Sequence, residues 1–487
     1  MTMLNHHSNK ILLLLSAFLL FSCNKLVEIP DPKNSLTTDK VFNNDTQAIG
    51  AMAGILTQMI NAGASSSFAN GLVNQIAMAS ADELSIVGSV FAVNNSRGEV
   101  ARNALTAEST STNNIWSSAY QAIYGANGVI EGIEASKSVL LHAQTRTQLT
   151  AEAKFIRAFS YFYLVNCFGD VPLVLTTNLA ENSNKPRTAV NIVYQQIIKD
   201  LIEAINGLPA DYAAGGGERI RANKWAAKAL LARVYLYTGD HANAIQQATD
   251  VIGQTGLYQL ETADLNNVFL KNSPETIWQL QQNVNKDFTG NAVPEAISLL
   301  PSPLHTGPAG DLSSSLLKAF ELGDRRKAAW IDSTDFAQGG QTYHSRFVYK
   351  YKTGFHNLAI GSAAIEYYMV LRLAEMYLIR GEAFALSGQL SAGIDDLNIL
   401  RLRAGILPLS KSLTRDQTLA AIAKERQTEL FGEWGHRWFD LKRTGKAEQV
   451  LSAISAKQPW RGNYQLLYPI PKTELQRDHF LTQNPNY

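Results

Sequence analysis

The sequence has very little cysteine. Cys23 and Cys167 are the only two cysteines in 487 residues, so the chain cannot form more than one internal disulfide, and it cannot build a metal site from several thiolates. Positive charge is not in excess either, because 43 Lys and Arg face 42 Asp and Glu and the formal net charge is +1. Proteins that bind nucleic acid need a basic face, so we expect no nucleic-acid partner.

The sequence also lacks an apolar run long enough to span a membrane. Residues 11–21 read ILLLLSAFLLF, but a spanning helix needs about 20 apolar residues, whereas the core of a signal peptide needs roughly 7 to 15. Lys10 precedes this run, and the small residue Ser22 stands directly before Cys23. This arrangement resembles the lipobox of bacterial lipoproteins. The alternative is an ordinary secretory signal in which the cysteine is incidental.

The lipobox resemblance divides the chain into three parts. It implies that residues 1–22 are a cleaved lipoprotein signal peptide and that Cys23 is lipidated, with palmitate among its acyl chains, so that the lipid anchors the protein to a membrane. Residues 23–40 are polar and contain Pro30 and Pro32, a composition that favours an extended tether. We expect residues 41–487 to form a single domain.

Catalytic motifs are missing as well. The sequence contains no Gly-x-Ser-x-Gly, no His-Glu-x-x-His and no phosphate-binding loop. One charged segment, KERQTELFGEWGHRWFDLKRTG at residues 424–445, could be imagined to hold a catalytic carboxylate pair. Helical spacing favours a structural role, because it places Arg426 beside Glu429 and Glu433 beside Arg437 as neighbours able to form ion pairs. We therefore expect no enzyme activity, no cofactor and no metal.

Helical periodicity dominates what is present. In LTAEAKFIRAFSYFYLVNCF, at residues 149–168, Phe155, Phe159 and Phe162 share one face, while Glu152 and Arg157 lie largely off it. The sequence GDVP that follows is typical of a helix end, because glycine closes a helix and proline prevents its continuation. Further helices are expected at residues 115–138, 190–206 and 413–432.

Two segments repeat the same spacing of small residues. In each, a small residue is followed seven positions later by a glycine and twelve positions later by a second small residue. The residues are Ala232, Gly239 and Ala244 in the first segment and Gly381, Gly388 and Gly393 in the second. Two closely packed antiparallel helices with a glycine in the turn would produce this spacing, which resembles that of tetratricopeptide repeats. We therefore expect a mainly α fold built on tetratricopeptide-like helix pairs.

Residues 255–365 interrupt the helical pattern. The strings ETIWQLQQN and RFVYKYK alternate as β-strands do, and PEAISLLPSPLHTGPAGD is rich in turn-forming residues. We expect a loop-rich insertion that contains short β-strands. Long irregular loops on a rigid scaffold often carry function, so this insertion is the candidate binding region.

Several strings, in order along the chain, resemble the SusD/RagB family of outer-membrane nutrient-binding lipoproteins. They are the lipoprotein start, AEAKFIRAFSYFYLVNCFGDVPLV, YYMVLRLAEMYLIRGEA, ERQTELFGEWGHRWFDLKRTG, YPIPKTEL and the closing LTQNPNY. The resemblance runs from Cys23 to Tyr487. It implies four tetratricopeptide-like helix pairs, exposure on the surface of the outer membrane, and a role as a lid over a SusC-like TonB-dependent transporter. Members of the family bind oligosaccharides or, in the RagB branch, peptides, without cleaving them.

Two loops contain the residue types that a glycan site needs. Sugar rings stack their C–H faces on aromatic side chains, and their hydroxyls bond to amide and carboxylate groups. The candidates are Asp82, Phe91, Asn94 and Asn95 in the first loop, Asn285, Asp287, Phe288 and Asn291 in the second, and Trp330 and Tyr343 in the same irregular region. We predict a shallow site formed by the Asp82–Asn95 and Asn285–Tyr343 loops.

Three functions fit the sequence. The first is capture of oligosaccharides for a transporter, the second is capture of peptides by the same fold, and the third is a repeat scaffold that binds only protein. An aromatic and amide-rich groove would favour the glycan. A pocket that satisfies backbone N–H and C=O groups would favour the peptide, and a continuous concave helical surface would favour the scaffold.

Overall fold

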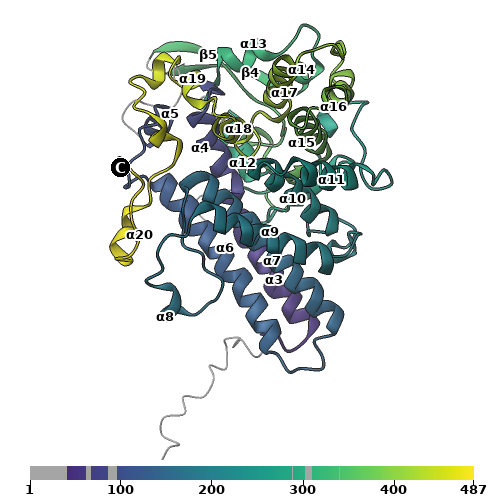
Figure 1. Ribbon diagram of the computed structural model, residues 1–487, viewed down its shortest axis with the longest axis vertical. Helices are drawn as coiled ribbons and strands as arrows, with labels where there is room; N and C mark the ends of the chain where they lie inside the picture. The colour runs from purple at the N-terminus through teal and green to yellow at the C-terminus, as the bar shows by residue number, and fades with distance from the viewer. Residues whose placement is uncertain (1–40, 62–66, 86–95, 288, 302–309, 339) are drawn as a thin grey trace, which may run out of the picture.

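The chain folds into a mainly α-helical body, as the sequence predicts. The computed structural model describes residues 41–487 except 62–66, 86–95, 288, 302–309 and 339. Long helices run side by side through the lower half of the molecule, and the later helices and the strands lie above them (Figure 1). Within the described ranges, none of the helices has both the length and the apolar character to cross a bilayer. Cys23 and the predicted tether lie outside the described residues.

The lower half is built from consecutive helices that pack in antiparallel pairs. Helix α7 packs against α6 on one side and against α9 on the other, and α3 packs against α6. The helices predicted at residues 115–138 and 190–206 are confirmed as α6 and α9. The bounds are α3 Asp45–Asn61, α6 Thr110–Ala135, α7 Ala143–Phe168 and α9 Val190–Gly207.

Helix α7 is buried on nearly all sides from Leu149 onward, so the charged residues that lie off its aromatic face are buried as well. Glu152 and Arg157 are 1% and 6% exposed. The Arg157 guanidinium donates to both carboxylate oxygens of Asp200 on α9, at 2.8 and 2.7 Å, and Arg221 pairs with Glu152. Neighbouring helices cover this helix on opposite faces, so its charges are buried and paired.

The two segments with repeated small residues form the helix pairs that their spacing predicts. In the first pair, Gly239 closes α10 with a left-handed φ of 79°, and in the second Gly388 follows α15 with a φ of 83°. Gly381 and Gly393 lie at the crossing of the second pair, where a Cβ added to Gly393 would approach the Gly381 carbonyl oxygen to 2.7 Å. The bounds are α10 Lys224–Thr238, α11 His241–Ile252, α15 Leu373–Leu386 and α16 Leu390–Arg403.

The helix predicted at residues 413–432 is confirmed as α17, Arg415–Leu430, but the ion pairs predicted at its end and just beyond it are wrong. A turn in which Trp434 has a φ of 48° separates α17 from α18, His436–Arg443, so Glu433 and Arg437 do not share a helix. The actual partners come from elsewhere in the chain: Asp440 for Arg426, Lys350 and Arg372 for Glu433, and Asp82 for Arg437.

The predicted insertion contains short strands, as the sequence indicates: β2 to β5 lie within it, and β1 and β6 pair with it from outside. In the described residues, β2 pairs with β6, β4 with β5 in a hairpin, and β1 with β3. All residues of β2 and β6 are buried, so the alternation of buried and exposed residues that the first string predicts is absent along β2. The bounds are β1 Leu84–Ser85, β2 Thr276–Leu280, β3 Asp311–Leu312, β4 Ile331–Gln338, β5 Gln341–Val348 and β6 Tyr368–Arg372.

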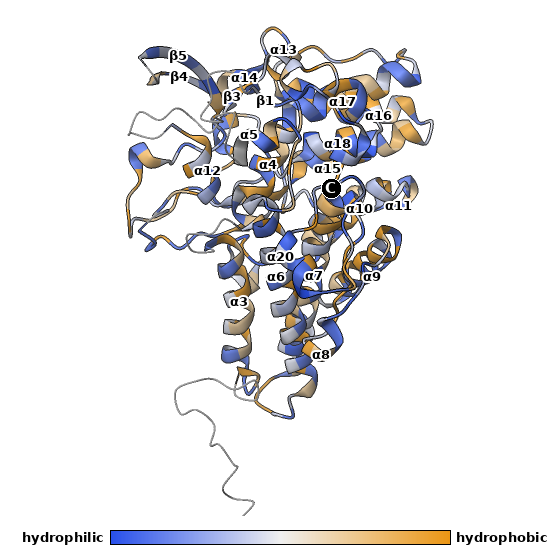
Figure 2. Ribbon diagram, turned by 90° about the vertical axis from the view of Figure 1, so that its left-hand side faces the viewer, coloured by the Kyte–Doolittle hydropathy of each residue, from blue (hydrophilic) through white to orange (hydrophobic). Residues whose placement is uncertain are grey.

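Short helices connect these elements, and one large hydrophobic core runs through both halves of the molecule. The β4–β5 hairpin projects from this body (Figure 2). The short α-helices are α4 Val73–Ser80, α5 Ser96–Ala101, α8 Leu179–Asn182, α12 Pro294–Leu299, α13 Ser314–Ala319, α14 Arg325–Trp330, α19 Ala447–Leu451 and α20 Lys472–Arg477. A π-helical turn at Phe68–Leu72 precedes α4, and short 3₁₀ turns lie at Ala213–Gly215, Leu265–Asn267, Phe355–Asn357, Ser455–Lys457 and Asn463–Leu466.

Candidate ligand-binding surface

Two distant segments meet at a loop rich in amide side chains, which we call the amide loop, residues 281–292. The Asn61 side-chain carbonyl, at the end of α3, accepts the Asn283 N–H at 2.9 Å. On the opposite side, the Val284 carbonyl accepts the Gly361 N–H at 2.7 Å. The second contact joins the amide loop to residues 357–366, which we call the facing loop. Both contacts lie near the start of the amide loop and attach it to α3 and to the facing loop.

Asn291 belongs to the framework that holds the two loops together. Its side-chain carbonyl accepts the Ala359 N–H at 2.8 Å, and its own N–H donates to the Ala359 carbonyl at 3.2 Å. Its carbonyl accepts the Gln282 side-chain amide at 3.0 Å, and Gln282 also donates to the Glu366 carbonyl. Both carbonyl groups of Asn291 therefore accept hydrogen bonds that hold the two loops in place.

Asn285 and Asp287 point outward from this framework. Both side chains are exposed. Asn285 also lies close to the facing loop, because a Cβ added to Gly361 would be 3.7 Å from its side-chain oxygen. Gly361 has a φ of 77°, a conformation that glycine adopts readily. The amide of Asn285 and the carboxylate of Asp287 are therefore available to a ligand that carries hydroxyl groups.

Beside the two loops lies a bonded group centred on Tyr367. Its hydroxyl is 3.2 Å from Glu218 and accepts the Gln281 side-chain amide at 2.9 Å. The Lys271 ammonium lies 5.7 Å from the centre of its ring. The facing loop itself exposes Ile365, at 55%. Glu218, Tyr367 and the facing loop are not among the residues predicted from the sequence, because their proximity to the amide loop depends on contacts between segments far apart in the chain.

Tyr343 stands on the projecting hairpin. It faces Phe336 on the neighbouring strand, and the two rings stack with centroids 5.6 Å apart. Its hydroxyl donates to the Gln341 side chain at 2.9 Å. Phe336 is buried, whereas Tyr343 is half-buried. The stacked neighbour fixes the Tyr343 ring, and its partial exposure leaves ring surface for a contact with a ligand.

Trp330 is part of the core, and its predicted role in stacking on a ligand is wrong. The side chain is 0% exposed, and its indole N–H donates to the Leu265 carbonyl at 2.9 Å. The Lys350 ammonium lies 4.7 Å from the ring centre, and Phe269 meets the ring edge to face. Because protein covers all of its surface, the Trp330 indole cannot stack on a ligand.

Asp82 is also buried, and its predicted contact with a ligand is wrong as well. It is 2% exposed, and Arg437 donates to its two carboxylate oxygens at 2.6 and 2.8 Å. Burial opposes the charge of this carboxylate, but the bonds from Arg437 outweigh it and hold the pKa of Asp82 below its usual value. Asp82 therefore joins α4 to α18. Four further candidates, Phe91, Asn94, Asn95 and Phe288, lie outside the described residues.

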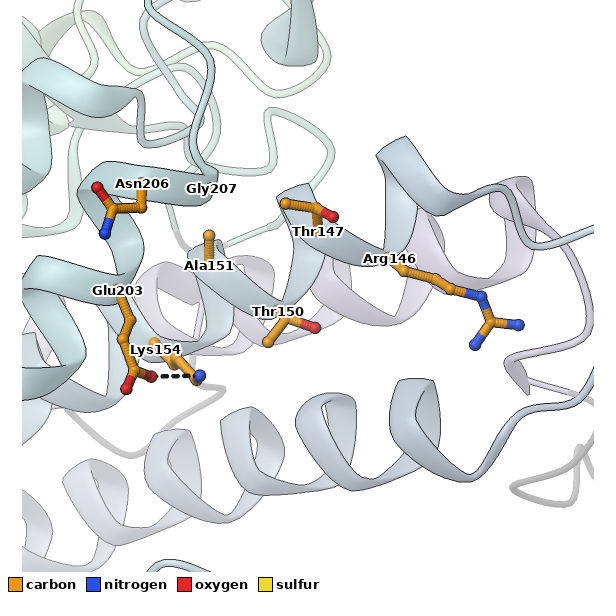
Figure 3. Close-up of a pocket in the computed structure, with 8 residues that line it drawn as sticks. All are labelled: Arg146, Thr147, Thr150, Ala151, Lys154, Glu203, Asn206 and Gly207. Atoms are coloured by element: carbon orange, nitrogen blue, oxygen red, sulfur yellow. Dashed lines mark hydrogen bonds and ion pairs between the residues drawn. The ribbon is translucent and has the colours of Figure 1, made fainter.

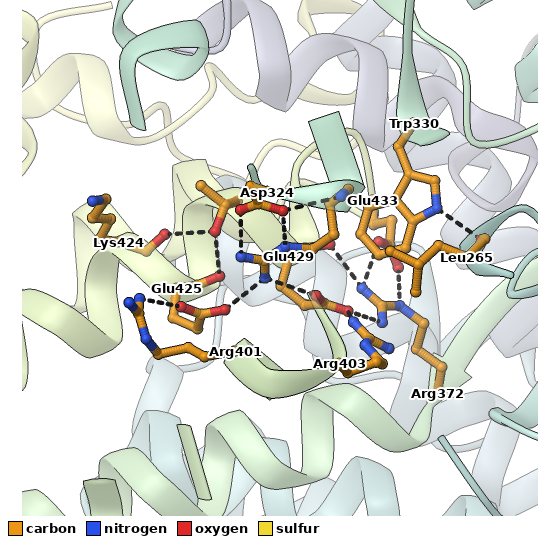
Figure 4. Close-up of polar contacts among 12 residues, drawn as sticks. Leu265, Asp324, Trp330, Arg372, Arg401, Arg403, Lys424, Glu425, Glu429 and Glu433 are labelled. Carbon is orange, nitrogen blue, oxygen red and sulfur yellow. Dashed lines mark hydrogen bonds and ion pairs between the residues drawn. The ribbon is translucent and has the colours of Figure 1, made fainter. Parts of the chain in front are cut away.

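A buried ionic cluster holds Glu425, Glu429 and Glu433, three of the four acidic residues of the segment at 424–445 (Figure 4). At its centre is Glu429, which is 0% exposed and pairs with Arg326, Arg372 and Arg403. Burial opposes ionisation of Glu429, yet the three guanidinium groups hold its pKa well below the usual range. Glu425 is bound in the same way by Arg326, at 2.6 Å. These carboxylates are inaccessible to a substrate, so their role is to join α14, α16 and α17 with β6.

One open groove lies elsewhere, between α7 and α9, with a volume of about 410 Å³ (Figure 3). Its charged residues Lys154 and Glu203 pair with each other across the groove. No predicted binding residue and no aromatic side chain lines it; the lining residues are Arg146, Thr147, Thr150, Ala151, Lys154, Glu203, Asn206 and Gly207. Within the described residues, no group of three or more His, Cys, Asp and Glu could hold a metal ion.

Comparison with known proteins gives the family. One family model, described as "Starch-binding associating with outer membrane", matches residues 38–236, and a second, described as "SusD family", matches residues 319–487. Most of the chain lies within one model or the other.

The chain belongs to the SusD/RagB family. Among its SusD relatives, SusD-like protein P2 of Formosa agariphila is 28% identical over 415 residues, which cover 76% of this chain and 80% of that protein. A solved structure described as a laminarin-binding SusD-like protein superimposes with a TM-score of 0.72 at 26% identity and covers 92% of this chain and 100% of its own. A SusD superfamily protein from Bacteroides vulgatus gives a TM-score of 0.75 at 20% identity, which supports the fold alone.

Proposed function

We propose that this protein is a glycan-binding lipoprotein of the outer membrane that captures oligosaccharides and delivers them to a SusC-like TonB-dependent transporter. The observation that carries the proposal is the likeness, over almost the whole chain, to a SusD-like protein described as binding laminarin. The family model that matches the N-terminal half is named for starch binding in association with the outer membrane. Both descriptions favour a carbohydrate ligand over a peptide.

The amide loop gives the proposal a physical basis. Asn285 and Asp287 are exposed on a loop whose backbone is fixed by Asn61 and by the facing loop. A fixed loop loses little conformational freedom when a ligand binds, so its polar groups bond to hydroxyls at a low entropic cost. Water competes for the same groups at an exposed surface, so each bond contributes little. We expect dissociation constants between about micromolar and millimolar for a single oligosaccharide.

Lipidation at Cys23 would place this surface beside a transporter in the same membrane. Tethering raises the effective concentration of a captured ligand at its acceptor, so weak binding suffices for delivery. The described residues support binding rather than cleavage, because the clustered carboxylates at residues 424–445 are buried and paired with arginine. A hydrolase of glycosides needs two accessible carboxyl groups that face each other across the substrate.

An array that carries glycans and peptides tests the proposal when it is probed with the purified full-length protein in detergent. We expect retention on one or more classes of oligosaccharide and none on peptides. Tyr343→Ala and Asn285→Ala should reduce retention. Tyr124→Ala is the matched control, because Tyr124 is 59% exposed but lies on α6. Retention on peptides alone would replace the glycan with the RagB type of ligand, and retention on neither would leave the scaffold function.

A further inference from the structure

The loop between α6 and α7, residues 136–142, exposes two adjacent aliphatic side chains at one end of the molecule. Val139 is 88% exposed and Leu140 is 58% exposed. Leu179, at the start of α8, is 79% exposed, and the segment before it is bonded to α6 through Thr177 and Glu131. Single exposed aliphatic residues are common on protein surfaces, but an adjacent pair at the tip of a fixed loop calls for an explanation.

The loop is rigidly built, so the exposure of this pair is a fixed feature. The Arg146 guanidinium donates to four backbone carbonyls, those of Ile133 at 2.7 Å, Ser136 at 3.0 Å, Ser138 at 2.8 Å and Leu141 at 2.9 Å. The Leu140 N–H donates to the Ser138 hydroxyl at 3.2 Å. Leu141 is buried and holds the loop against the helices. These contacts leave Val139 and Leu140 as the residues that face outward.

The α6–α7 loop also contacts residues 42–45, at the start of the domain. The Ser136 and Ser138 hydroxyls donate to the Phe42 and Asn43 carbonyls, at 2.7 and 2.6 Å. The Asp45 carboxylate accepts the His142 N–H at 2.9 Å. In Figure 1 the start of α3 and the α6–α7 loop lie together at the lower end of the molecule. The exposed aliphatic pair therefore lies beside the point where the segment from Cys23 reaches the domain.

We infer that Val139 and Leu140 contact the lipid bilayer into which the anchor on Cys23 inserts, so that the α6–α7 loop is a second membrane contact. This inference rests on the lipid anchor of the proposed function. Fully extended, residues 24–40 span about 60 Å, so the anchor keeps this end of the domain within that distance of the bilayer. An apolar side chain near a bilayer gains by leaving water, and a tethered one does so at a high effective concentration.

The charges around the loop favour an apolar contact with lipid. Lys137 and Glu134 are both exposed and carry opposite signs, so they give the loop no strong charge of either sign. Contact with lipid headgroups through a basic patch would need several cations. Binding through Val139 and Leu140 should therefore depend little on salt. It would also orient the domain, because the projecting hairpin lies at the opposite end of the molecule (Figure 2).

Fluorescence quenching by brominated phospholipid tests this inference. The lipidated full-length protein is placed on phosphatidylcholine vesicles with Leu140→Trp. Leu322→Trp is the control, because Leu322 is fully exposed between α13 and α14, at the other end of the molecule. We expect the emission that Leu140→Trp adds to shift to the blue and to be lost in brominated vesicles, at low and at high salt. The emission that Leu322→Trp adds should be unchanged.

Two outcomes would overturn the inference, and flotation of the vesicles separates them. In the first outcome, the protein floats with the vesicles but the emission added by Leu140→Trp and by Leu322→Trp responds alike. The loop then does not touch lipid, and Val139 and Leu140 would instead be a contact for a protein partner. If the protein does not float, the lipid anchor is wrong and the inference fails with it, whereas glycan binding is measured independently. Val139→Ser combined with Leu140→Trp should reduce the blue shift, which would confirm that the two side chains insert together.

Discussion

Enlarging one glycine at a helix crossing should destabilise the whole fold. Gly393 on α16 packs against α15, and a Cβ at this position would lie 2.7 Å from the Gly381 carbonyl oxygen and 3.4 Å from the Ala385 nitrogen. Both are backbone atoms, so neither can turn aside as a flexible side chain could. The Gly393→Ala variant can be accommodated only if the two helices move apart.

The change in the free energy of unfolding depends on two opposing contributions, helix propensity and packing. Alanine is favoured over glycine inside a helix by roughly 0.5–1 kcal/mol, and an extra methyl group in a packed contact costs about 1–3 kcal/mol. Gly54 on α3 provides the matched control, because it is also inside a helix but has no atom within 4 Å of an added Cβ. Gly54→Ala should therefore stabilise by up to about 1 kcal/mol, and Gly393→Ala should destabilise by up to about 2 kcal/mol.

Thermal unfolding followed by circular dichroism measures both variants. We expect the melting temperature to rise with Gly54→Ala and to fall with Gly393→Ala, while both keep the helical spectrum of the parent. Equal shifts for the two variants would refute the reasoning, because they would mean that the crossing of α15 and α16 tolerates a methyl group. The assignment of the repeated small residues to close helix contacts would then be wrong.

Three further predictions follow from buried charges and from the anchor. Burial raises the pKa of Glu295 to about 8. Between pH 4.5 and 8 only the unfolded chain releases this proton, so the free energy of unfolding should fall as the pH rises through this range. Urea unfolding at several pH values measures this fall, and Glu295→Gln should flatten it. Asp200→Asn removes the carboxylate that pairs with Arg157 and should cost about 3–5 kcal/mol, whereas Glu181→Gln in an exposed pair should cost less than about 1 kcal/mol in the same assay. Cys23→Ala should abolish labelling with palmitate and release the protein from membranes; continued membrane association of the unlabelled variant would count against the anchor.

The helical part of the fold could be predicted because its signals are local. The turn glycines and the small residues at the crossing of α15 and α16 follow one another within a few turns of helix, so their spacing is visible in the sequence. The ion pairs could not be predicted in the same way. Arg326 meets Glu425 across a separation of 99 residues, and Arg437 meets Asp82 across 355. Spacing within one helix predicts neither contact.

The candidate site was predicted only in part, for a similar reason. The sequence identifies irregular segments that contain aromatic and amide side chains, but the burial of each side chain depends on segments far away in the chain. Trp330 is covered by residues such as Leu265 and Lys350, and no pattern around position 330 reveals this. Asn285 and Asp287 are exposed because their loop lies at the surface between α3 and the facing loop.

Titration calorimetry with an oligosaccharide retained on the array tests the central claim most directly. The titration is run with the parent protein, with Tyr343→Ala and Asn285→Ala, and with the control Tyr124→Ala, and the sugar is recovered afterwards and sized by chromatography. The account predicts saturable binding at about micromolar to millimolar concentrations, weakened in both of the first two variants and unchanged in the control, with the sugar recovered at its original length. Equal binding by all four proteins would place the site elsewhere, and a shortened sugar would contradict a protein that binds its ligand without cleaving it.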